Sequence, residues 1–453
     1  MPHWSRHWAD GAVNKKMAWV ARIFGIAEDE LAPVLIAQLV FFLLFAAYFM
    51  LRPVRETMGI AGGVENLQWL FTGTFLATLA AMPLFGWIAG RVQRRRILPW
   101  TFGFFAANLM LFAVGFRWQP ENLWIARTFY IWISVFNLIA ISVVWSVLVD
   151  LIPTAQAKRV FALMAAGASL GGLVGPLIGI TLVERIGHEG LLWLASALLI
   201  AAIVASRQLQ RWRDAQPLHD ELTASARQRP LGGSPFAGIT TVLTSPYLLG
   251  ISAFVLLLAS VSTFLYFEQA RLVEMRFPDR ADQTQVFGTI DFIVQSLTVV
   301  SQLFITGRIV QRLGIWVLLA AVPVVTMLGF LWLALAPTFA VLAVVMVVRR
   351  FGEYAFVRPG REMLFTVVPT EAKYKAKNFI DSVVYRGGDA VSGWAKTLVD
   401  MLAHQPAIAA LVGAAIALAW ALTGAGLARA QHRLASAYGA AGTESPAPGR
   451  QRI

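Results

Sequence analysis

The chain has 453 residues, of which 58% are hydrophobic and 14% are charged, and its formal net charge is +13. Soluble domains carry about a quarter of charged residues, so this composition excludes a soluble globular protein and predicts an integral membrane protein. The chain has no cysteine, which excludes disulfides and thiolate metal sites.

The polar part of the sequence lacks the usual signatures of enzymes. We find no P-loop, GxSxG or HExxH motif, and the six histidines have no metal-ligand spacing. We therefore expect no enzymatic activity, no metal and no cofactor.

Apolar windows recur along the chain at the length needed to cross a membrane, about 20 residues. The first begins near Leu31, too late for a cleaved signal peptide, so we expect it to be a retained helix. The windows cover 31–52, 68–90, 97–115, 123–149, 161–183, 191–206, 247–267, 286–306, 315–336, 338–357, 379–402 and 406–428.

These windows predict an all-α polytopic membrane protein with twelve transmembrane helices. The predicted regions are a cytosolic N-terminal segment (1–30), an N-terminal six-helix bundle (31–206), a cytosolic linker (207–246), a C-terminal six-helix bundle (247–428) and a cytosolic C-terminal tail (429–453).

Basic residues are distributed unevenly between the two sides that these windows define. Most of the 38 Lys and Arg residues fall in the tails, the linker and alternate loops, which the positive-inside rule places in the cytosol. Both termini are therefore expected to be cytosolic, and the expected location is a bacterial inner (plasma) membrane. The bilayer accounts for the positive charge, so we expect no nucleic acid partner.

Short matches between the two halves predict a pseudo-repeat. The segment 90–94 (GRVQR) resembles 307–312 (GRIVQR), and three further pairs recur at a constant offset of about 216 residues. Two parallel six-helix repeats are the architecture of the major facilitator superfamily. The segment 86–96 resembles that superfamily's loop between helices two and three, but Gly90 replaces its usual Asp, so its salt bridge is not expected. The further pairs are Pro153-Thr154 with Pro369-Thr370, Gly171-Gly172 with Gly387-Gly388, and Arg55 with Arg271.

Ionisable residues inside the apolar windows are the candidate functional residues, because charges at membrane depth are costly and usually line a bundle interior or an aqueous path. At 100° per residue, window 379–402 has one polar face, expected to face water, and one apolar face. The candidate substrate-binding or coupling residues are Arg55, Glu56, Arg271, Asp291, Gln295, Asp381, Tyr385, Arg386, Asp389 and Lys396.

A second group of charges lies near the predicted cytosolic ends and is expected to form a cytosolic gate. Arg349, Arg350 and Glu353 are expected to form gate salt bridges or cytosolic anchors rather than substrate contacts. For Glu56 the alternative is a position at headgroup depth. The predicted gate residues are Arg91, Arg94, Arg308, Arg312, Arg361 and Glu362.

Several motifs resemble the nucleotide (ATP/ADP) translocases. Residues 358–363 (RPGREM) and 373–381 (KYKAKNFID) resemble that family's P-T-K-E-M and K-x-K-G-K-A-x-I-D. Residues 51–58 (LRPVRETM) are similar to its L-R-x-x-K-D-T-L, and 157–159 (AKR) to its A-K-R. The resemblance implies a twelve-helix facilitator-like fold and nucleotide exchange.

The chain departs from that family at three functional positions. The family's helix-one lysine is Arg55, no acid stands near Asn137 where the family has Glu, and Asp389 replaces a lysine. These changes predict a divergent member, a secondary active transporter that exchanges nucleotides or a related phosphorylated or anionic metabolite by alternating access. One alternative is a proton-coupled exporter or importer of an unrelated solute, with Asp291 or Asp389 as proton carrier. A non-transporting scaffold is disfavoured, because the polar segments are too small for a soluble domain.

Overall fold

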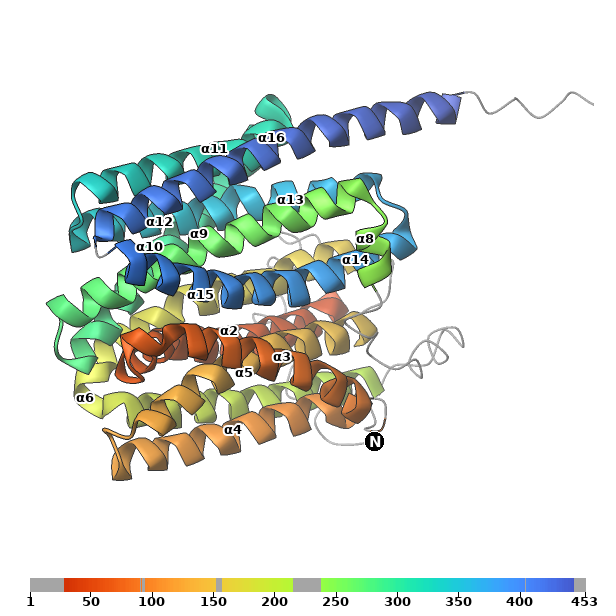
Figure 1. Ribbon diagram of the computed structural model, residues 1–453. Helices are drawn as coiled ribbons and strands as arrows, with labels where there is room; N and C mark the ends of the chain where they lie inside the picture. The colour runs from red at the N-terminus through yellow and green to blue at the C-terminus, as the bar shows by residue number, and fades with distance from the viewer. Residues whose placement is uncertain are drawn as a thin grey trace, which may run out of the picture. The chain divides into compact units, whose positions relative to one another are not determined.

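The computed structural model describes residues 28–89, 91, 94–151, 157–214, 238–403 and 405–443, and its regular structure in these ranges is helical (Figure 1). Segment 1–27, Gly90, Pro153-Thr154, most of the predicted linker and residues 444–453 lie outside the described residues.

The helices follow the predicted windows closely. The first half contains α2 (Glu28–Ala61), η2 (Val64–Asn66), α3 (Leu67–Ala89), α4 (Arg94–Trp118), α5 (Leu123–Leu151) and α6 (Ala157–Asp214). The second half contains α8 (Ile239–Leu243), α9 (Pro246–Arg276), α10 (Arg280–Phe304), α11 (Thr306–Leu335), α12 (Phe339–Gly352), η3 (Glu353–Val357), α13 (Arg358–Leu364), η4 (Phe365–Val367), α14 (Thr370–Phe379), η5 (Ile380–Val384), α15 (Tyr385–Ala403) and α16 (Pro406–Thr443).

Nine helices in the described ranges are long and apolar enough to cross a membrane. One of them, Ala165–Trp212, has 48 residues, about twice the length that a bilayer requires. Gly187 interrupts it with φ 68° and ψ 178°, a backbone conformation that glycine adopts readily. The predicted windows 338–357 and 379–402 are not among the nine, because π-helical turns at η3 and η5 divide their helices and both carry charges.

The chain forms two compact units. The first comprises residues 1–55, 85–125 and 136–232, and the second comprises 56–84, 126–135 and 233–453. The division thus assigns the end of α2, most of α3 and a short part of α5 to the same unit as the C-terminal half. Helix also extends into the predicted linker, as far as Asp214, and into the predicted tail, as far as Thr443.

Within the first unit, α6 packs on α2 through glycines spaced four residues apart. A Cβ at Gly167, Gly171 or Gly175 would lie 2.2, 2.6 or 2.6 Å from the carbonyl oxygen of Gln38, Phe42 or Ala46. Glycines at this spacing let two helix backbones approach closely, which is how helices associate in lipid without a hydrophobic driving force. Their missing side chains therefore set the distance between α2 and α6.

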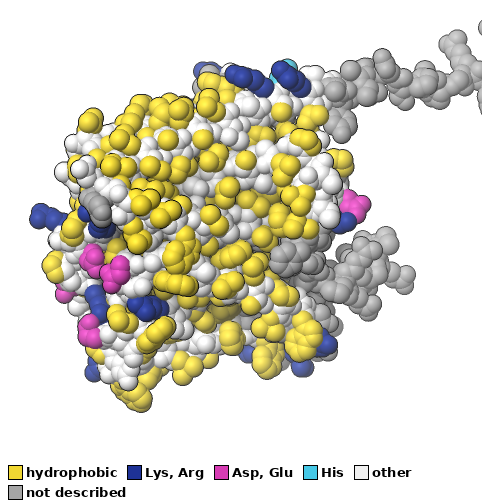
Figure 2. All heavy atoms as spheres, viewed as in Figure 1, with side chains coloured by type: hydrophobic (Ala, Val, Ile, Leu, Met, Phe, Trp, Pro, Cys, Tyr) yellow, Lys and Arg dark blue, Asp and Glu magenta, His cyan; other side chains and the backbone are white. Residues whose placement is uncertain are grey.

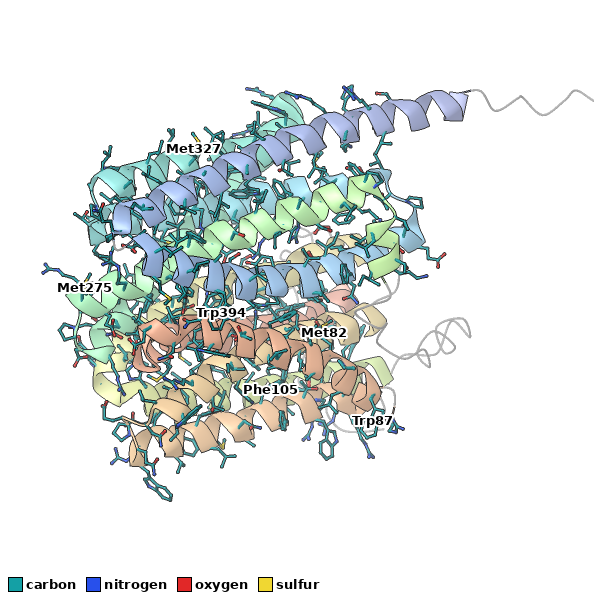
Figure 3. All side chains as sticks on the ribbon, in the orientation of Figure 1. Met82, Trp87, Phe105, Met275, Met327 and Trp394 are labelled. Atoms are coloured by element: carbon teal, nitrogen blue, oxygen red, sulfur yellow. The ribbon has the colours of Figure 1, made fainter. Side chains whose placement is uncertain are left out.

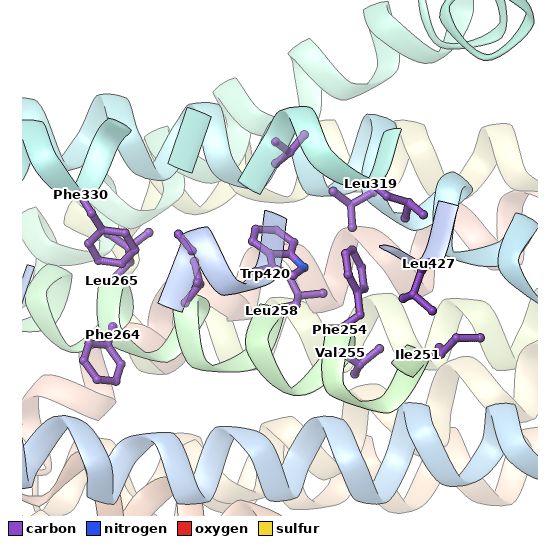
Figure 4. Packing of buried hydrophobic residues seen from close by; sticks show 14 of the residues in the cluster. Ile251, Phe254, Val255, Leu258, Phe264, Leu265, Leu319, Phe330, Trp420 and Leu427 are labelled. Carbon is purple, nitrogen blue, oxygen red and sulfur yellow. The ribbon is translucent and has the colours of Figure 1, made fainter. Parts of the chain in front are cut away.

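Within the second unit, an apolar core joins α9, α11, α12 and α16. The rings of Phe254 and Trp420 lie 5.6 Å apart, and Leu319, Phe330 and Leu427 are buried around them (Figure 4). Hydrophobic side chains cover much of the surface in Figure 2, and many large apolar residues are exposed. Such an exterior is typical of a protein surrounded by lipid.

The close packing of α6 on α2 predicts opposite effects for the same glycine-to-alanine substitution at two different positions. Gly171→Ala should destabilise the protein by about 1–3 kcal/mol, because the new Cβ would overlap backbone atoms that cannot move away. Gly426→Ala in α16, where nothing lies within 4 Å, should be neutral or gain about 0.5–1 kcal/mol in helix propensity. Apparent melting temperatures in detergent measure both, and equal effects would contradict the packing described above.

Candidate functional site

A buried ion pair joins α10 to α12 in the second unit. Arg350 Nη2 lies 2.5 Å from Asp291 Oδ1, and the two side chains are 7% and 4% exposed. Arg349, the residue before Arg350, donates from Nη1 to Ser262 Oγ at 2.8 Å and to Glu353 Oε2 at 3.0 Å. Consecutive helical residues point about 100° apart, so the two arginines reach different neighbours, α9 and α10. The result is a buried charge cluster that holds three helices together.

A second group of polar contacts joins α15 to α9. Asp389 accepts a hydrogen bond from Thr263 Oγ1 at 3.4 Å and pairs with Arg386 Nη1 at 3.4 Å. Nearby, Ser392 and Ser260 share a hydrogen bond of 2.7 Å. The polar side of α15 therefore faces α9 within the protein rather than open water.

The opposite side of α15 carries its exposed apolar residues, including Val391 and Leu398. Towards the end of the same helix, the buried Lys396 donates to Asp400 at 2.5 Å. The division of this helix into one polar and one apolar side is thus present in the structure.

Asp381 belongs to a different set of contacts. It lies 3.1 Å from Arg361 of α13, and Glu362 pairs with Lys377 at 2.5 Å. The π-helical turn Ile380–Val384 inserts extra backbone between Asp381 and Asp389, so a uniform α-helical wheel does not describe this segment. The expectation of one continuous polar face over 379–402 therefore does not hold at Asp381, whose partner is on α13.

Distances along the helices place these groups in successive layers. The helix from Phe339 to Leu364 is continuous through η3, and at 1.5 Å per residue Arg350 lies about 16 Å from its first residue. Asp291 lies about 16 Å into α10 by the same rule, which agrees with their pairing. A hydrocarbon core is about 30 Å thick, so this pair lies near mid-depth of its helices.

Other contacts within the second unit join the ends of α2, α3 and α5 to the C-terminal helices. Thr57 Oγ1 lies 2.7 Å from Thr284 Oγ1, and Trp394 Nε1 donates to Thr72 Oγ1 at 3.1 Å. Figure 3 labels Trp394 on α15. The ring of Trp394 also meets that of Trp69 edge-on, with centroids 4.8 Å apart. Both halves of the chain therefore contribute to one packed layer, near the C-terminal end of α2 and the N-terminal ends of α3 and α10.

The remaining candidate residues are distributed over both units. In the second unit Glu56 is buried, Gln295 is half-buried and Arg271 pairs with Glu268. In the first unit Arg55 is half-buried, and the guanidinium of Arg91 lies 4.0 Å from the ring centroid of Trp87.

The outlying predicted gate residues form no common cluster in what the structure describes. Arg308 donates to the Phe304 carbonyl at 3.0 Å and Arg312 is exposed, whereas the Arg94 side chain lies outside the described residues. Among the predicted site and gate residues, the structure thus pairs Arg386 with Asp389 and Arg361 with Asp381, and leaves Asp291 paired with Arg350.

Sequence reasoning missed the importance of Arg349, Arg350 and Glu353. They were expected as gate bridges or anchors at the cytosolic end, but the helix continues beyond them to Leu364 and buries all three. The available signal was the pair of adjacent arginines after the apolar run 339–348. Ser262, the partner of Arg349, gave no signal, because Ser is common in membrane helices.

A polytopic helical protein with paired charges at mid-depth has the features of a secondary transporter. The sequence model of the Major Facilitator Superfamily matches residues 33–376. The chain belongs to this superfamily.

Two bacterial carrier proteins are similar in sequence to part of this chain. ADP,ATP carrier protein 1 of Chlamydia muridarum is 25% identical over 313 residues, and that of Chlamydia trachomatis serovar D is 24% identical over 312. Each match covers 61% of this chain and only 58% of the carrier. The prediction of a divergent resemblance to nucleotide translocases is confirmed.

Solved structures agree with the fold. The nucleoside transporter NupG aligns with TM-score 0.61 at 15% identity, covering 87% of this chain and 98% of NupG. A POT family transporter in complex with 5-aminolevulinic acid aligns with TM-score 0.62 at 12% identity, covering 87% and 96%. At these identities the likeness shows the fold, and the prediction of an all-α, facilitator-type membrane protein is confirmed.

The buried pair predicts a non-additive effect on stability. Asp291→Asn should destabilise by about 3–5 kcal/mol, because it leaves the Arg350 charge buried without its counter-charge. Adding Arg350→Gln should recover part of this loss, as measured by apparent melting temperature in detergent.

The control is an exposed pair on α14. Lys375 donates to Glu371 at 2.7 Å and lowers the pKa of this carboxyl, but surface pairs contribute little to stability. Glu371→Gln should therefore leave the melting temperature unchanged. An Asp291→Asn protein as stable as wild type would contradict the stabilising role of the buried pair.

Proposed function

We propose that this protein is a secondary active transporter that exchanges nucleotides or a related phosphorylated or anionic metabolite by alternating access. The carrier relatives and the translocase-like motifs at 358–363 and 373–381 support this substrate class. The proposed location is a bacterial inner membrane with both termini in the cytosol, from the distribution of basic residues.

The proposed topology has twelve transmembrane helices in two six-helix pseudo-repeats, 31–206 and 247–428. Nine spans are long and apolar enough by themselves, and the break at Gly187 divides the 48-residue span into two. The charged helices around α12 and α15 supply the remaining two. Their charges and π-helical turns explain why apolar length alone does not identify them.

The observation that carries the proposed function is the layered charge in the second unit. Asp291, Arg349, Arg350, Glu353 and Asp389 are buried, and they lie in helices that the proposed topology places across the membrane. Such groups are costly in lipid and usually mark a substrate or ion path. Arg386, 25% exposed beside Asp389, is a point at which a solute can reach this cluster.

The same unit supports a gate at each end of that path. The contacts of Thr57 with Thr284 and of Trp394 with Thr72 form the proposed closed outer gate, because they join both halves of the chain. The pairs Arg361–Asp381 and Lys377–Glu362 form part of the proposed cytosolic gate. Alternating access requires that one set of contacts breaks when the other closes.

Counterflow in proteoliposomes tests the proposed exchange. Vesicles preloaded with unlabelled ATP, ADP, AMP or other phosphorylated metabolites should take up the labelled counterpart, whereas empty vesicles should not. Arg55→Ala should reduce nucleotide counterflow strongly, since it removes the cation at the family's functional lysine position. Absence of counterflow for every solute, with correctly folded protein, would refute the proposal.

A proton-coupled transporter is the second candidate, favoured by the environment of Asp389. This carboxylate is buried in a proposed membrane-spanning helix, 3.4 Å from Arg386 and 3.4 Å from Thr263, and carboxylates at membrane depth are typical of proton relays. Uptake that needs a pH gradient and is lost in Asp389→Asn would support this candidate. Full counterflow without a gradient would exclude it.

A cysteine pair tests the outer gate. The chain has no cysteine, so Thr57→Cys with Thr284→Cys introduces a single pair at a site where the native side-chain oxygens are 2.7 Å apart. Oxidation should form a disulfide and stop counterflow, and reduction should restore it. Either single variant should transport equally under both conditions, and unchanged transport by the cross-linked protein would rule out opening at this position.

A further inference from the structure

Two arginines near the charge cluster are each paired with a tyrosine. The Arg358 guanidinium lies 4.3 Å from the ring centroid of Tyr354, and the Arg386 guanidinium lies 5.7 Å from that of Tyr385. Arg358 is 58% exposed and Arg386 is 25% exposed, in contrast to the buried Arg349 and Arg350. These two cations are therefore accessible to a ligand from outside the cluster.

Each of the two arginines lies just after a π-helical turn. Arg358 follows the π-helical turn Glu353–Val357, and Arg386 follows the π-helical turn Ile380–Val384 by one residue. Short π-helical segments occur frequently at functional sites. Both turns belong to the second unit, so their relation does not depend on the placement of the first.

The pairs also lie at the same depth and close together. Arg358 lies about 28 Å from the start of its helix at Phe339, and Arg386 about 26 Å from the end of its helix at Ala403. Arg361 lies 3.1 Å from Asp381, and Arg358 and Tyr385 each lie about one helical turn from this ion pair. The two arginine–tyrosine pairs are therefore neighbours on adjacent helices.

The carboxylates form the next layer and limit the charge that this site accepts. Glu353 and Asp389 each lie about 21 Å along their helices by the same rule, and they lie 3.6 Å from Arg358 and 3.4 Å from Arg386. A phosphate monoester carries about −1.5 to −2 at pH 7, which two guanidinium groups can neutralise. Each further phosphate adds negative charge beside two fixed carboxylates.

We infer that Arg358 and Arg386, with Tyr354 and Tyr385, form a binding site for a nucleoside monophosphate. The guanidinium groups bind the phosphate, the tyrosine rings offer stacking surfaces to the base, and Glu353 or Asp389 accepts hydrogen bonds from the ribose hydroxyls. This inference rests on the proposed transport function and narrows its substrate class, because it disfavours the nucleoside triphosphate.

Calorimetry with the purified full chain tests this assignment using AMP, ATP, adenosine and inorganic phosphate. AMP should bind at least about tenfold more tightly than ATP. Arg358→Gln and Arg386→Gln should each weaken AMP binding about tenfold or more, the effect of losing one charge-assisted hydrogen bond, and leave adenosine binding unchanged. Arg433→Gln, an exposed arginine on α16, is the matched control and should not affect AMP.

Two further variants test whether the loss of affinity comes from binding rather than from misfolding. Arg386→Lys keeps the charge and should retain more affinity for AMP than Arg386→Gln, and Tyr354→Leu should weaken AMP more than inorganic phosphate. Size-exclusion profiles identical to wild type establish that each variant is folded.

The outcomes distinguish this inference from the proposed function. ATP binding as tight as AMP, inorganic phosphate binding as tight as AMP, or an Arg386→Gln protein that behaves like Arg433→Gln would overturn the monophosphate site. If ATP nevertheless shows counterflow, the transport proposal stands while this inference falls. If no solute shows counterflow, the transport proposal itself fails.

Discussion

An ionised side chain at membrane depth must have a counter-charge, and the second compact unit is built around this requirement. Asp291 with Arg350, and Arg349 with Glu353, satisfy it inside the protein. These contacts fix α10 and α12 relative to each other more specifically than apolar packing can. Lipid tails are as apolar as the side chains, so apolar contacts between helices have no hydrophobic driving force in a membrane. The apolar core around Phe254 and Trp420 then fills the other side of α9. Charge pairing sets the register of these helices, and packing sets their spacing.

The π-helical turns determine which charges meet. Without them, the residues before and after each turn would continue along one α-helical face. With η5 in place, Asp381 pairs with Arg361 while Asp389 meets α9 and Arg386. The same helix therefore contributes to two layers with different partners, one near its cytosolic end in the proposed topology and one near mid-depth. A small change in these turns would alter both layers together, which makes them suitable positions for coupling a gate to a substrate site.

Much of the fold, and part of the site, could be predicted from the sequence. Apolar length located the helices because the membrane imposes it, and the alternation of polar and apolar residues on α15 located its buried side, with Asp389 and Lys396. The roles of Arg349 and Arg350 could not be predicted, because hydropathy does not show whether a charge at the end of an apolar run lies at the surface or whether the helix continues beyond it. The π-helical turns and the assignment of residues 56–84 to the second unit depend on tertiary packing, which has no local sequence signal.

The exposure of Arg358 and Arg386 bears on how exchange would operate. Buried pairs such as Asp291–Arg350 are almost fully enclosed, so they offer a solute little access. Arg358 is 58% exposed and Arg386 is 25% exposed, so an anion can reach both. In the proposed mechanism, reorienting a site that contains two accessible cations and no bound anion is costly. A bound anion removes that cost in both directions. This asymmetry between loaded and empty states is the physical condition for obligatory exchange. It arises because the two arginines are accessible, whereas the Asp291–Arg350 pair deeper in the unit is buried.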